Sequence, residues 1–303
     1  MQPVKGKCIR MFKGNLVALV TPFDAAGEID FAALSSLVSF QVEKGTDGIV
    51  IGGTTGESVT LRAGEFRRLL TAVIEQVKGR VPVIAGTGSN ATEKTIAATR
   101  EAADLGADGA LVVTPYYNRP TQHGLIAHFR AIADNSEIPL ILYNVPTRTA
   151  VDMRPETVRQ LAQHPSIIGV KEAAPVAGRT AELVRLCGPG FTVLGGDDGT
   201  FLEAMKEGAK GVISVAANVA PAEFRSICRA AEAGDWATAT SLESRLHQLF
   251  ELLGVETNPI PVKWALHEMS LCSSQIRLPL TPLSPEYRTP LRDCLRTLGL
   301  LPR

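Results

Sequence analysis

A lysine in an apolar run is the first feature of this sequence that could do chemistry. The stretch "SIIGVKEAAP", residues 166–175, places Lys171 at the end of a segment typical of a buried strand. An ammonium group held away from water without a partner is costly, and burial lowers the pKa of lysine from its ordinary value of ~10.4. A desolvated amine of this kind attacks carbonyl carbons and forms Schiff bases. Lys171 is therefore a candidate nucleophile.

The alternation of side chains along a strand indicates where Lys171 points. Gly169 and Lys171 share one face, and Val170 and Glu172 take the other. If Lys171 faces the interior of a closed sheet, its amine lies among apolar walls. The alternative is that Lys171 extends to the surface and pairs with a carboxylate such as Asp197, since ion-paired lysines outnumber catalytic ones.

A tyrosine on the preceding apolar segment favours the catalytic interpretation. Schiff-base formation requires a proton to leave the amine and another to reach the departing hydroxyl, and a phenol near the nitrogen can serve both steps. Tyr143, in "PLILYNVP", lies at the matching depth of that segment. The alternative is a core aromatic residue whose hydroxyl donates to a backbone carbonyl, as is common for buried tyrosines.

These residues belong to a repeating series of strands and helices. Amphipathic stretches that end in glycine, such as "AALSSLVSFQVEKG" and "ATEKTIAATREAADLG", separate short apolar segments. The segments are continuously apolar, as expected for a parallel sheet covered on both faces. Eight of them predict an α/β fold of the (β/α)8 TIM barrel class. They span 16–23, 48–53, 81–88, 109–115, 139–146, 167–173, 191–198 and 211–217.

The two ends of the chain differ from this pattern. Residues 1–10 are polar and basic, and Met11 opens the first apolar run, so we expect a disordered extension that the fold does not need. After Gly234 the strand pattern stops and the periodicity becomes helical. The sequence therefore predicts a barrel as the catalytic domain at 11–234 and a small C-terminal helical domain at 235–303.

Catalytic groups of such barrels lie at the carboxyl ends of the strands and in the loops that follow. This rule predicts that most of the unusual polar residues of the chain meet at one mouth of the barrel. They are Thr54, Thr55, Tyr116, Tyr117, Tyr143, Arg148, Lys171, Asp197 and Asp198, with Ile213 on the eighth strand.

Composition limits the classes of function. The chain has 303 residues, 45% hydrophobic and 20% charged, which is ordinary for a globular protein. Its 31 basic and 31 acidic residues balance, so nothing favours nucleic acid or a membrane as partner, and we expect a small-molecule ligand. Five cysteines without a C-x-x-C pair indicate a reducing compartment, which predicts a cytoplasmic location.

Neither a metal nor a dinucleotide is expected. The histidines show no paired spacing, and we expect Asp197 and Asp198 to cap the following helix rather than bind a cation. "VPVIAGTGSNA" contains a G-x-G-x-x-A pattern, which is a weak dinucleotide signature; the alternative is a tight strand-to-helix turn. A dinucleotide site there would leave Lys171 and the tyrosines unexplained.

Six motifs carry a resemblance to a known family. They are "GGTTGES", "TPYYNRP", "ILYNVPTRT", "GVKEA", "GVISVAANVAP" and "NPIPVKWAL". From about Met11 to its end the sequence resembles the dihydrodipicolinate synthases, in the pyruvate-dependent class I aldolase superfamily. The resemblance implies that pyruvate and aspartate semialdehyde condense through a lysine Schiff base to 4-hydroxy-tetrahydrodipicolinate, in lysine and diaminopimelate biosynthesis, without metal or cofactor. It also implies a homo-oligomer, usually a tetramer built from dimers.

The resemblance assigns roles position by position. Lys171 would form the Schiff base, and Tyr143 would donate and accept protons. Thr54 would link Tyr143 to Tyr117, which reaches in from a neighbouring subunit and completes a proton relay. The substrate-binding residues would be Thr55 for the pyruvate carboxylate, Arg148 for the carboxylate of the aldehyde, and Gly196 and the Ile213 carbonyl beside the lysine.

Two other classes of protein fit the sequence less well. N-acetylneuraminate lyases and keto-deoxy-sugar aldolases share the lysine and the tyrosine but use other second substrates. They generally lack the "YYNRP" segment and an arginine at the place of Arg148, both of which are present here. A non-catalytic binding module is disfavoured because every expected catalytic position is filled.

The sequence departs from the family where some members bind an inhibitor. In lysine-inhibited members, free lysine contacts a serine, an asparagine and a tyrosine, with two histidines and one acidic residue nearby. The first three are kept here as Ser58, Asn90 and Tyr116, but the other positions hold Ala63, Phe66 and Lys94. We therefore expect little or no inhibition by lysine.

Overall fold

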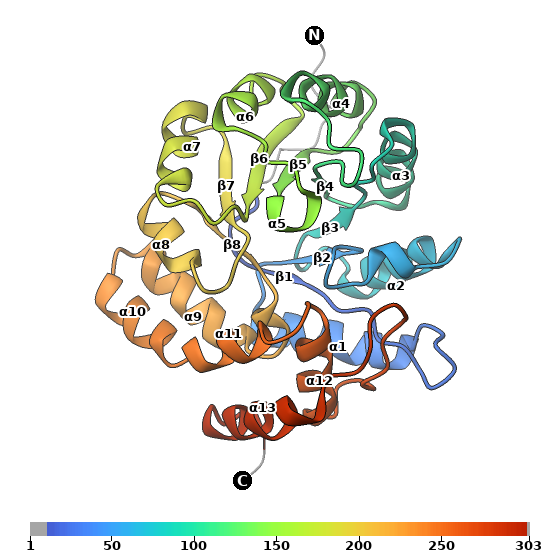
Figure 1. The fold of residues 1–303 in the computed structure, drawn as a ribbon, viewed down its shortest axis with the longest axis vertical. Coiled ribbons are helices and arrows are strands. Elements are labelled where there is room, and N and C mark those ends of the chain that lie inside the picture. Colours follow the sequence, from blue (N-terminus) through green and yellow to red (C-terminus); the bar gives the residue numbers. More distant parts are fainter. Residues whose placement is uncertain (1–10, 302–303) are drawn as a thin grey trace. The chain divides into compact units, whose positions relative to one another are not determined.

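The computed structural model describes residues 11–301, so the predicted extension at 1–10 lies outside the described residues (Figure 1). Within that range, eight strands form a closed parallel barrel in chain order, which confirms the predicted TIM barrel. The strands are β1 (Gly14–Ala18), β2 (Gly48–Ile51), β3 (Val83–Gly86), β4 (Gly109–Val113), β5 (Leu140–Asn144), β6 (Ile167–Glu172), β7 (Thr192–Gly195) and β8 (Gly211–Ser214).

Helices follow the strands along the chain, with two short 3-10 turns at Ser58–Thr60 and Ala216–Asn218. The helices are α1 (Phe31–Lys44), α2 (Glu65–Val77), α3 (Thr92–Leu105), α4 (Gln122–Asp134), α5 (Pro146–Thr149), α6 (Pro155–Leu161), α7 (Arg179–Cys187), α8 (Phe201–Lys206), α9 (Pro221–Glu232), α10 (Trp236–Ser244), α11 (His247–Leu253), α12 (Ile260–Glu268) and α13 (Pro285–Thr297).

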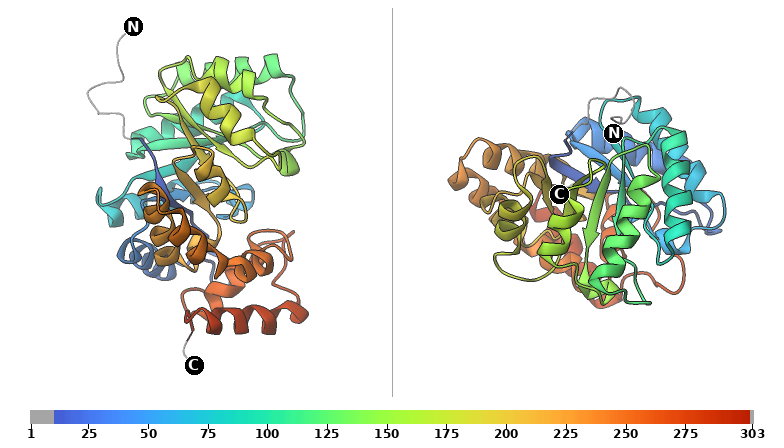
Figure 2. Two further views of the ribbon diagram at one scale, coloured as in Figure 1. Left: turned by 90° about the vertical axis from the view of Figure 1, so that its left-hand side faces the viewer. Right: turned by 90° about the horizontal axis from the view of Figure 1, so that it is seen from above.

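The described chain divides into two compact units. One contains residues 82–213, with β3 to β7 and most of β8, and residues 11–13 belong to it. The other contains residues 14–81 and 214–301, with β1, β2 and the C-terminal helices. In the first unit, α3, α4, α6 and α7 pack side by side in this order outside the strands (Figure 2). Each unit thus covers its strands with its own helices.

Strands β5 and β6 show why the apolar runs become strands of this kind. All residues of both strands are buried, as expected for parallel strands covered on two faces. Their register pairs Leu142 with Val170 and Tyr143 with Lys171. The predicted periodicity therefore places the two candidate catalytic residues directly beside each other.

The glycines predicted to end two helices do so. Gly45 follows α1 with φ 89° and Gly106 follows α3 with φ 96°, in the left-handed region that glycine adopts without steric cost. The amide of Gly45 donates to the carbonyls of Gln41 and Val42. These caps stop the helices and return the chain to the next strand.

The G-x-G-x-x-A pattern is a strand-to-helix turn. Strand β3 ends at Gly86, and Ala91 is the N-cap residue of α3. A Cβ atom on Gly88 would lie 2.4 Å from the backbone nitrogen of Val113, so a glycine is required where the turn approaches β4. The glycines therefore have a packing role that needs no dinucleotide.

Asp197 and Asp198 do not cap the helix that follows β7, contrary to the prediction. Helix α8 begins at Phe201, and Thr200 occupies its N-cap position. Asp197 Oδ2 accepts a hydrogen bond of 3.0 Å from the Thr200 hydroxyl. The longer turn after β7 separates Asp197 from the first helical turn, which the sequence pattern did not indicate.

The C-terminal residues are helical, as the periodicity predicts. Helices α11, α12 and α13 pack against one another, and α10 packs against α9 (orange and red in Figure 2). The division into a barrel domain and a helical domain at residue 234 stays a prediction. Among residues 11–301, no helix is both long enough and apolar enough to cross a membrane.

Candidate active site

Lys171 and Tyr143 form the centre of the candidate site. They are paired in the register of β6 and β5, and the Lys171 Nζ lies 4.5 Å from the centre of the Tyr143 ring. Lys171 is 5% exposed and Tyr143 is 8% exposed. The amine is thus held against an aromatic face in a site that solvent barely reaches.

Two glycines near the lysine allow the neighbouring strands to approach closely. Gly169 precedes Lys171 by two residues on β6, and a Cβ atom there would lie 2.6 Å from the Thr192 carbonyl oxygen. Gly196 follows β7, and a Cβ atom there would lie 2.7 Å from the Ala173 Cβ and 2.9 Å from the Glu172 carbonyl oxygen. The Gly196 amide donates to that same carbonyl at 2.8 Å. Glycine at both positions lets the neighbouring strands close around Lys171.

Burial changes the acid–base properties of Lys171. Its pKa is lowered to about 8, mainly because burial removes the ammonium from water. The positive charge of Arg148 also lowers this pKa, whereas the negative charges of Asp198 and, more weakly, Asp197 raise it. With a pKa near 8, about one lysine in ten is a free amine at pH 7, against about one in ~2,500 for an ordinary lysine. The interpretation of Lys171 as a surface lysine paired with Asp197 does not fit this burial, and Asp197 is itself exposed.

Arg148 lies on the short helix that follows β5. Helix α5 begins with Pro146, whose fixed φ suits the first helical position, and the Arg148 amide donates to the Val145 carbonyl at 3.0 Å. Thr149 ties the end of this helix down, because its hydroxyl donates to the carbonyls of Val145 and Val151. The guanidinium is exposed, and its charge acts on the pKa of Lys171. Arg148 therefore lies on the same side of the unit as the lysine.

Ile213 and the tyrosine pair after β4 complete the predicted residues of this unit. Ile213 is fully buried on β8. Tyr116 is half-buried, whereas Tyr117 has φ 73° and is 90% exposed. The Asn118 amide donates to the Tyr116 carbonyl at 2.9 Å, so the turn is hydrogen-bonded. This turn presents Tyr117 outward instead of toward Tyr143 of the same chain.

Thr54 and Thr55 belong to the other unit, in the turn after β2. Thr54 is half-buried, and its carbonyl accepts from the Glu57 amide at 3.1 Å. Thr55 is 2% exposed, and its hydroxyl accepts a hydrogen bond of 3.1 Å from the Asn258 amide group. The turn is thus held by its own backbone and by a C-terminal residue.

A family model described as the dihydrodipicolinate synthetase family matches residues 11–298. The chain belongs to this family. It is 53% identical to the 4-hydroxy-tetrahydrodipicolinate synthase of Pseudomonas aeruginosa, with 96% of this chain and all of that protein covered. The predicted family resemblance is confirmed.

Solved structures of the family have the same fold. The chloride-inhibited dihydrodipicolinate synthase of Acinetobacter baumannii, complexed with pyruvate, is 47% identical, with a TM-score of 0.94 over 96% of this chain and all of that chain. The enzyme of Cyanidioschyzon merolae with lysine bound is 40% identical, with a TM-score of 0.93 over the same shares of the two chains.

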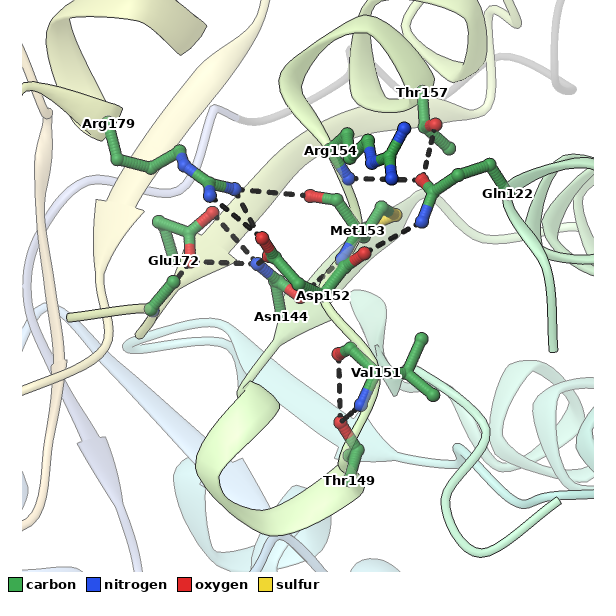
Figure 3. A network of polar contacts seen from close by, with 11 residues as sticks. Gln122, Asn144, Thr149, Val151, Asp152, Met153, Arg154, Thr157, Glu172 and Arg179 are labelled. Atoms are coloured by element: carbon green, nitrogen blue, oxygen red, sulfur yellow. Dashed lines mark hydrogen bonds and ion pairs between the residues drawn. The ribbon is translucent and has the colours of Figure 1, made fainter. Parts of the chain in front are cut away.

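Sequence reasoning missed a polar network behind the catalytic pair. Asn144 and Glu172 directly follow Tyr143 and Lys171, so they point to the other face of the sheet. There the Asn144 amide group donates to the carboxylates of both Glu172 and Asp152 (Figure 3). The signal that could have found them is that Asn144 and Glu172 are polar residues at the ends of strands that are otherwise almost entirely apolar.

A second set that sequence reasoning missed supports the turn with Thr54 and Thr55. Glu57, which has φ 54°, forms an ion pair of 2.5 Å with Lys263, and both side chains are 1% exposed. Glu57 also accepts from the Arg277 amide at 3.0 Å, and Arg277 pairs with Glu65. The motif "NPIPVKWAL" is therefore partly structural, because its lysine neutralises a buried carboxylate.

Among residues 11–301, no group of three or more histidine, cysteine, aspartate or glutamate side chains could hold a metal ion. A nucleophilic amine, a phenol and an exposed guanidinium in one unit suit covalent catalysis on a carbonyl compound that carries a carboxylate.

Proposed function

We propose that the chain condenses pyruvate with L-aspartate 4-semialdehyde to 4-hydroxy-tetrahydrodipicolinate, as a lyase of lysine and diaminopimelate biosynthesis. The observation that carries this proposal is the buried Lys171, with a pKa lowered to about 8, against the ring of Tyr143. The family and the name of the P. aeruginosa relative support the choice of reaction.

Lys171 starts the reaction as a free amine. Its nitrogen attacks the keto carbon of pyruvate, and the resulting carbinolamine loses water when Tyr143 protonates its hydroxyl. The imine draws electrons from the methyl group, which loses a proton to the Tyr143 phenolate left by the dehydration and becomes an enamine carbon. That carbon attacks the aldehyde of the second substrate and forms the new carbon–carbon bond, while the aldehyde oxygen takes the proton from Tyr143 and becomes a hydroxyl. The amino group of the second substrate then attacks the imine carbon, closes the ring and releases the Lys171 amine.

We propose that the other predicted residues bind substrates or move protons. Arg148 suits the carboxylate of the aldehyde substrate, since it is exposed and a guanidinium fork matches a carboxylate. Thr55 binds the pyruvate carboxylate, and Thr54 connects Tyr143 with a Tyr117 from a neighbouring copy. Gly196 and the Ile213 carbonyl border the lysine.

The exposure of Tyr117 supports an oligomer. A tyrosine that is 90% exposed with a positive φ is held outward by its turn, which suits insertion into a second copy of the chain. We therefore propose at least a dimer, and a tetramer built from dimers, in the cytoplasm. Analytical ultracentrifugation should show no monomer at assay concentrations.

The second substrate is the point that most needs a test. A coupled assay should show turnover with pyruvate and aspartate semialdehyde and none with N-acetylmannosamine as acceptor. Turnover of pyruvate with N-acetylmannosamine but not with aspartate semialdehyde would favour an N-acetylneuraminate lyase. Turnover of keto-deoxy sugars instead would favour a keto-deoxy-sugar aldolase. No turnover with pyruvate and any aldehyde would refute the proposed function.

We also propose that lysine does not regulate this enzyme. The family's acidic position is occupied by the exposed Lys94 near the start of α3, and the histidine positions hold Ala63 and Phe66. A lysine ligand would meet a cation where the lysine-inhibited members offer a carboxylate.

A further inference from the structure

A buried asparagine joins the ends of β5 and β6 behind the catalytic pair. Asn144 and Glu172 are paired in the register, one residue after Tyr143 and Lys171. The Asn144 Nδ2 donates to both carboxyl oxygens of Glu172, at 3.0 and 3.2 Å, and to Asp152 Oδ1 at 2.9 Å. A displacement of the end of one strand would therefore also move the end of the other.

The same asparagine holds the segment that carries Arg148. Its Oδ1 accepts from the Met153 amide at 3.0 Å, and this donor fixes which side of the amide group is the oxygen. We call residues 145–153 the Arg148 segment. This segment starts directly after β5, and its last residue, Met153, is hydrogen-bonded to the side chain of Asn144 at the end of β5 (Figure 3). The segment is a closed loop anchored on one residue.

Two further anchors hold the end of the Arg148 segment. Arg179, at the start of α7, donates to Asp152 Oδ1 at 3.1 Å and Oδ2 at 2.8 Å, and to the Met153 carbonyl at 3.4 Å. Gln122, at the start of α4, donates to the Asp152 carbonyl at 2.8 Å and accepts from the Arg154 amide at 3.1 Å. The returning chain is therefore held from both neighbouring helices (Figure 3).

The charged groups of this network are Arg179, Asp152 and Glu172. Arg179 neutralises Asp152, whose pKa is lowered by hydrogen bonds from Arg179 and Asn144 against the effect of burial. Glu172 is 7% exposed and accepts from the Ala174 amide at 2.7 Å. Burial raises its pKa to about 7, which the hydrogen bonds and the Arg179 charge oppose.

We propose that Asn144, Glu172, Asp152 and Arg179 are positioning residues that hold the Arg148 segment at a fixed place relative to Lys171. Their task is to set where the guanidinium meets the carboxylate of the aldehyde substrate. None of them needs to touch a substrate. This inference rests on the proposed function, because it concerns the second substrate of that reaction.

The first test separates the two substrates. Arg179→Met removes the clamp on Asp152, and we expect KM for aspartate semialdehyde to rise at least tenfold while borohydride trapping of the pyruvate imine changes less than twofold. The matched control is Arg159→Met, an exposed arginine of α6, which should leave both unchanged. Equal losses in both half-reactions, or no loss in either, would overturn the proposal.

The second test asks whether the hydrogen bonds of Glu172 matter or only its bulk. Glu172→Gln keeps an acceptor for the Ala174 and Asn144 donors, so it should retain KM for the aldehyde within about threefold. Glu172→Leu has similar volume but no acceptor and should raise that KM at least tenfold. Equal KM values in the two variants would show that the hydrogen-bond acceptor of Glu172 does not position the Arg148 segment.

Hydrogen exchange provides a readout that does not depend on turnover. Arg179→Met should speed exchange in residues 145–153 at least tenfold, and Arg159→Met should not change it. Unchanged exchange in Arg179→Met would refute the network even if the wild-type enzyme is active. If wild-type protein condenses nothing, the proposed function fails, and the exchange rates alone decide whether the network holds the segment.

Discussion

The amine of Lys171 lies 4.5 Å from the centre of the Tyr143 ring, and the two residues are partners in the register of adjacent parallel strands. A cation over an aromatic face is usually stabilised in its charged form. Burial nevertheless lowers the pKa of Lys171 to about 8. The pair therefore places an amine that is partly unprotonated at neutral pH beside a phenol ring, as the proposed Schiff-base chemistry requires.

The first prediction concerns covalent trapping. Sodium borohydride with pyruvate should modify Lys171 and no other lysine, as located by peptide mass spectrometry. Lys263 is a matched internal control, because it is also buried but is paired with Glu57 at 2.5 Å. Since the amine must be free to react, the initial trapping rate should rise with pH around a midpoint near 8. An adduct on Lys263 or a midpoint near 10 would contradict this assignment.

The second prediction concerns Tyr143. Tyr143→Phe keeps the buried ring and removes only the hydroxyl, so the variant should fold with an unchanged melting temperature within a few degrees. General acid–base groups typically contribute ~10²–10⁴-fold, and kcat should fall by that order. Tyr287, a half-buried tyrosine of α13, gives the control Tyr287→Phe. Wild-type kcat in Tyr143→Phe would make this tyrosine a core aromatic only.

The third prediction concerns Arg148. Charge-assisted hydrogen bonds contribute ~1.5–3 kcal/mol, so Arg148→Ala should raise KM for aspartate semialdehyde roughly 10- to 100-fold. Pyruvate trapping should persist, with its midpoint moved to higher pH, because the Arg148 charge lowers the pKa of Lys171. Arg159→Ala is the control. A downward shift of the midpoint would show that the two charges do not interact as described.

The fourth prediction concerns stability and the buried carboxyl of Glu172. Its pKa is raised from 4.5 to about 7 in the folded chain, so the folded state binds more protons than the unfolded state between these values. Its contribution to stability is full below pH 4.5 and is lost as the pH rises to 7, by an amount of order ~3 kcal/mol.

Glu172→Gln cannot titrate, so it should lose less stability than wild type between pH 4.5 and 7 in urea unfolding. The buried His128, whose pKa is lowered to about 4 by burial, acts in the opposite direction over a similar range. Its effect is common to both proteins and cancels in the difference between them. A difference that is constant with pH would mean that Glu172 ionises normally.

Contacts that follow from the regular geometry of strands could be predicted from the sequence, whereas contacts that depend on the course of a loop could not. Lys171 and Tyr143 were predictable, because parallel strands with matched depth and period-two alternation place them side by side. The Arg179 contact with Asp152 was not, since it depends on how residues 145–153 return to β5. Thr200 at the N-cap of α8 was missed for the same reason, because loop length is set by packing that sequence periodicity does not encode.

The last prediction concerns free lysine as an inhibitor. Lys94 stands on α3 where the lysine-inhibited members of the family carry an acidic residue, and the adjacent Glu93 points about 100° away around the helix. Losing one charge-assisted bond costs ~1.5–3 kcal/mol, and even the lower value weakens binding more than tenfold before repulsion is counted.

Millimolar L-lysine should therefore leave steady-state turnover nearly unchanged. Lys94→Glu is the informative variant, because it restores the carboxylate on the same exposed helical position. That variant should become measurably more sensitive to lysine, and Glu93→Lys should not. Half-inhibition of the wild-type enzyme below about 1 mM, equivalent to roughly −4 kcal/mol of binding free energy, would show that Ser58, Asn90 and Tyr116 hold lysine without the acidic partner.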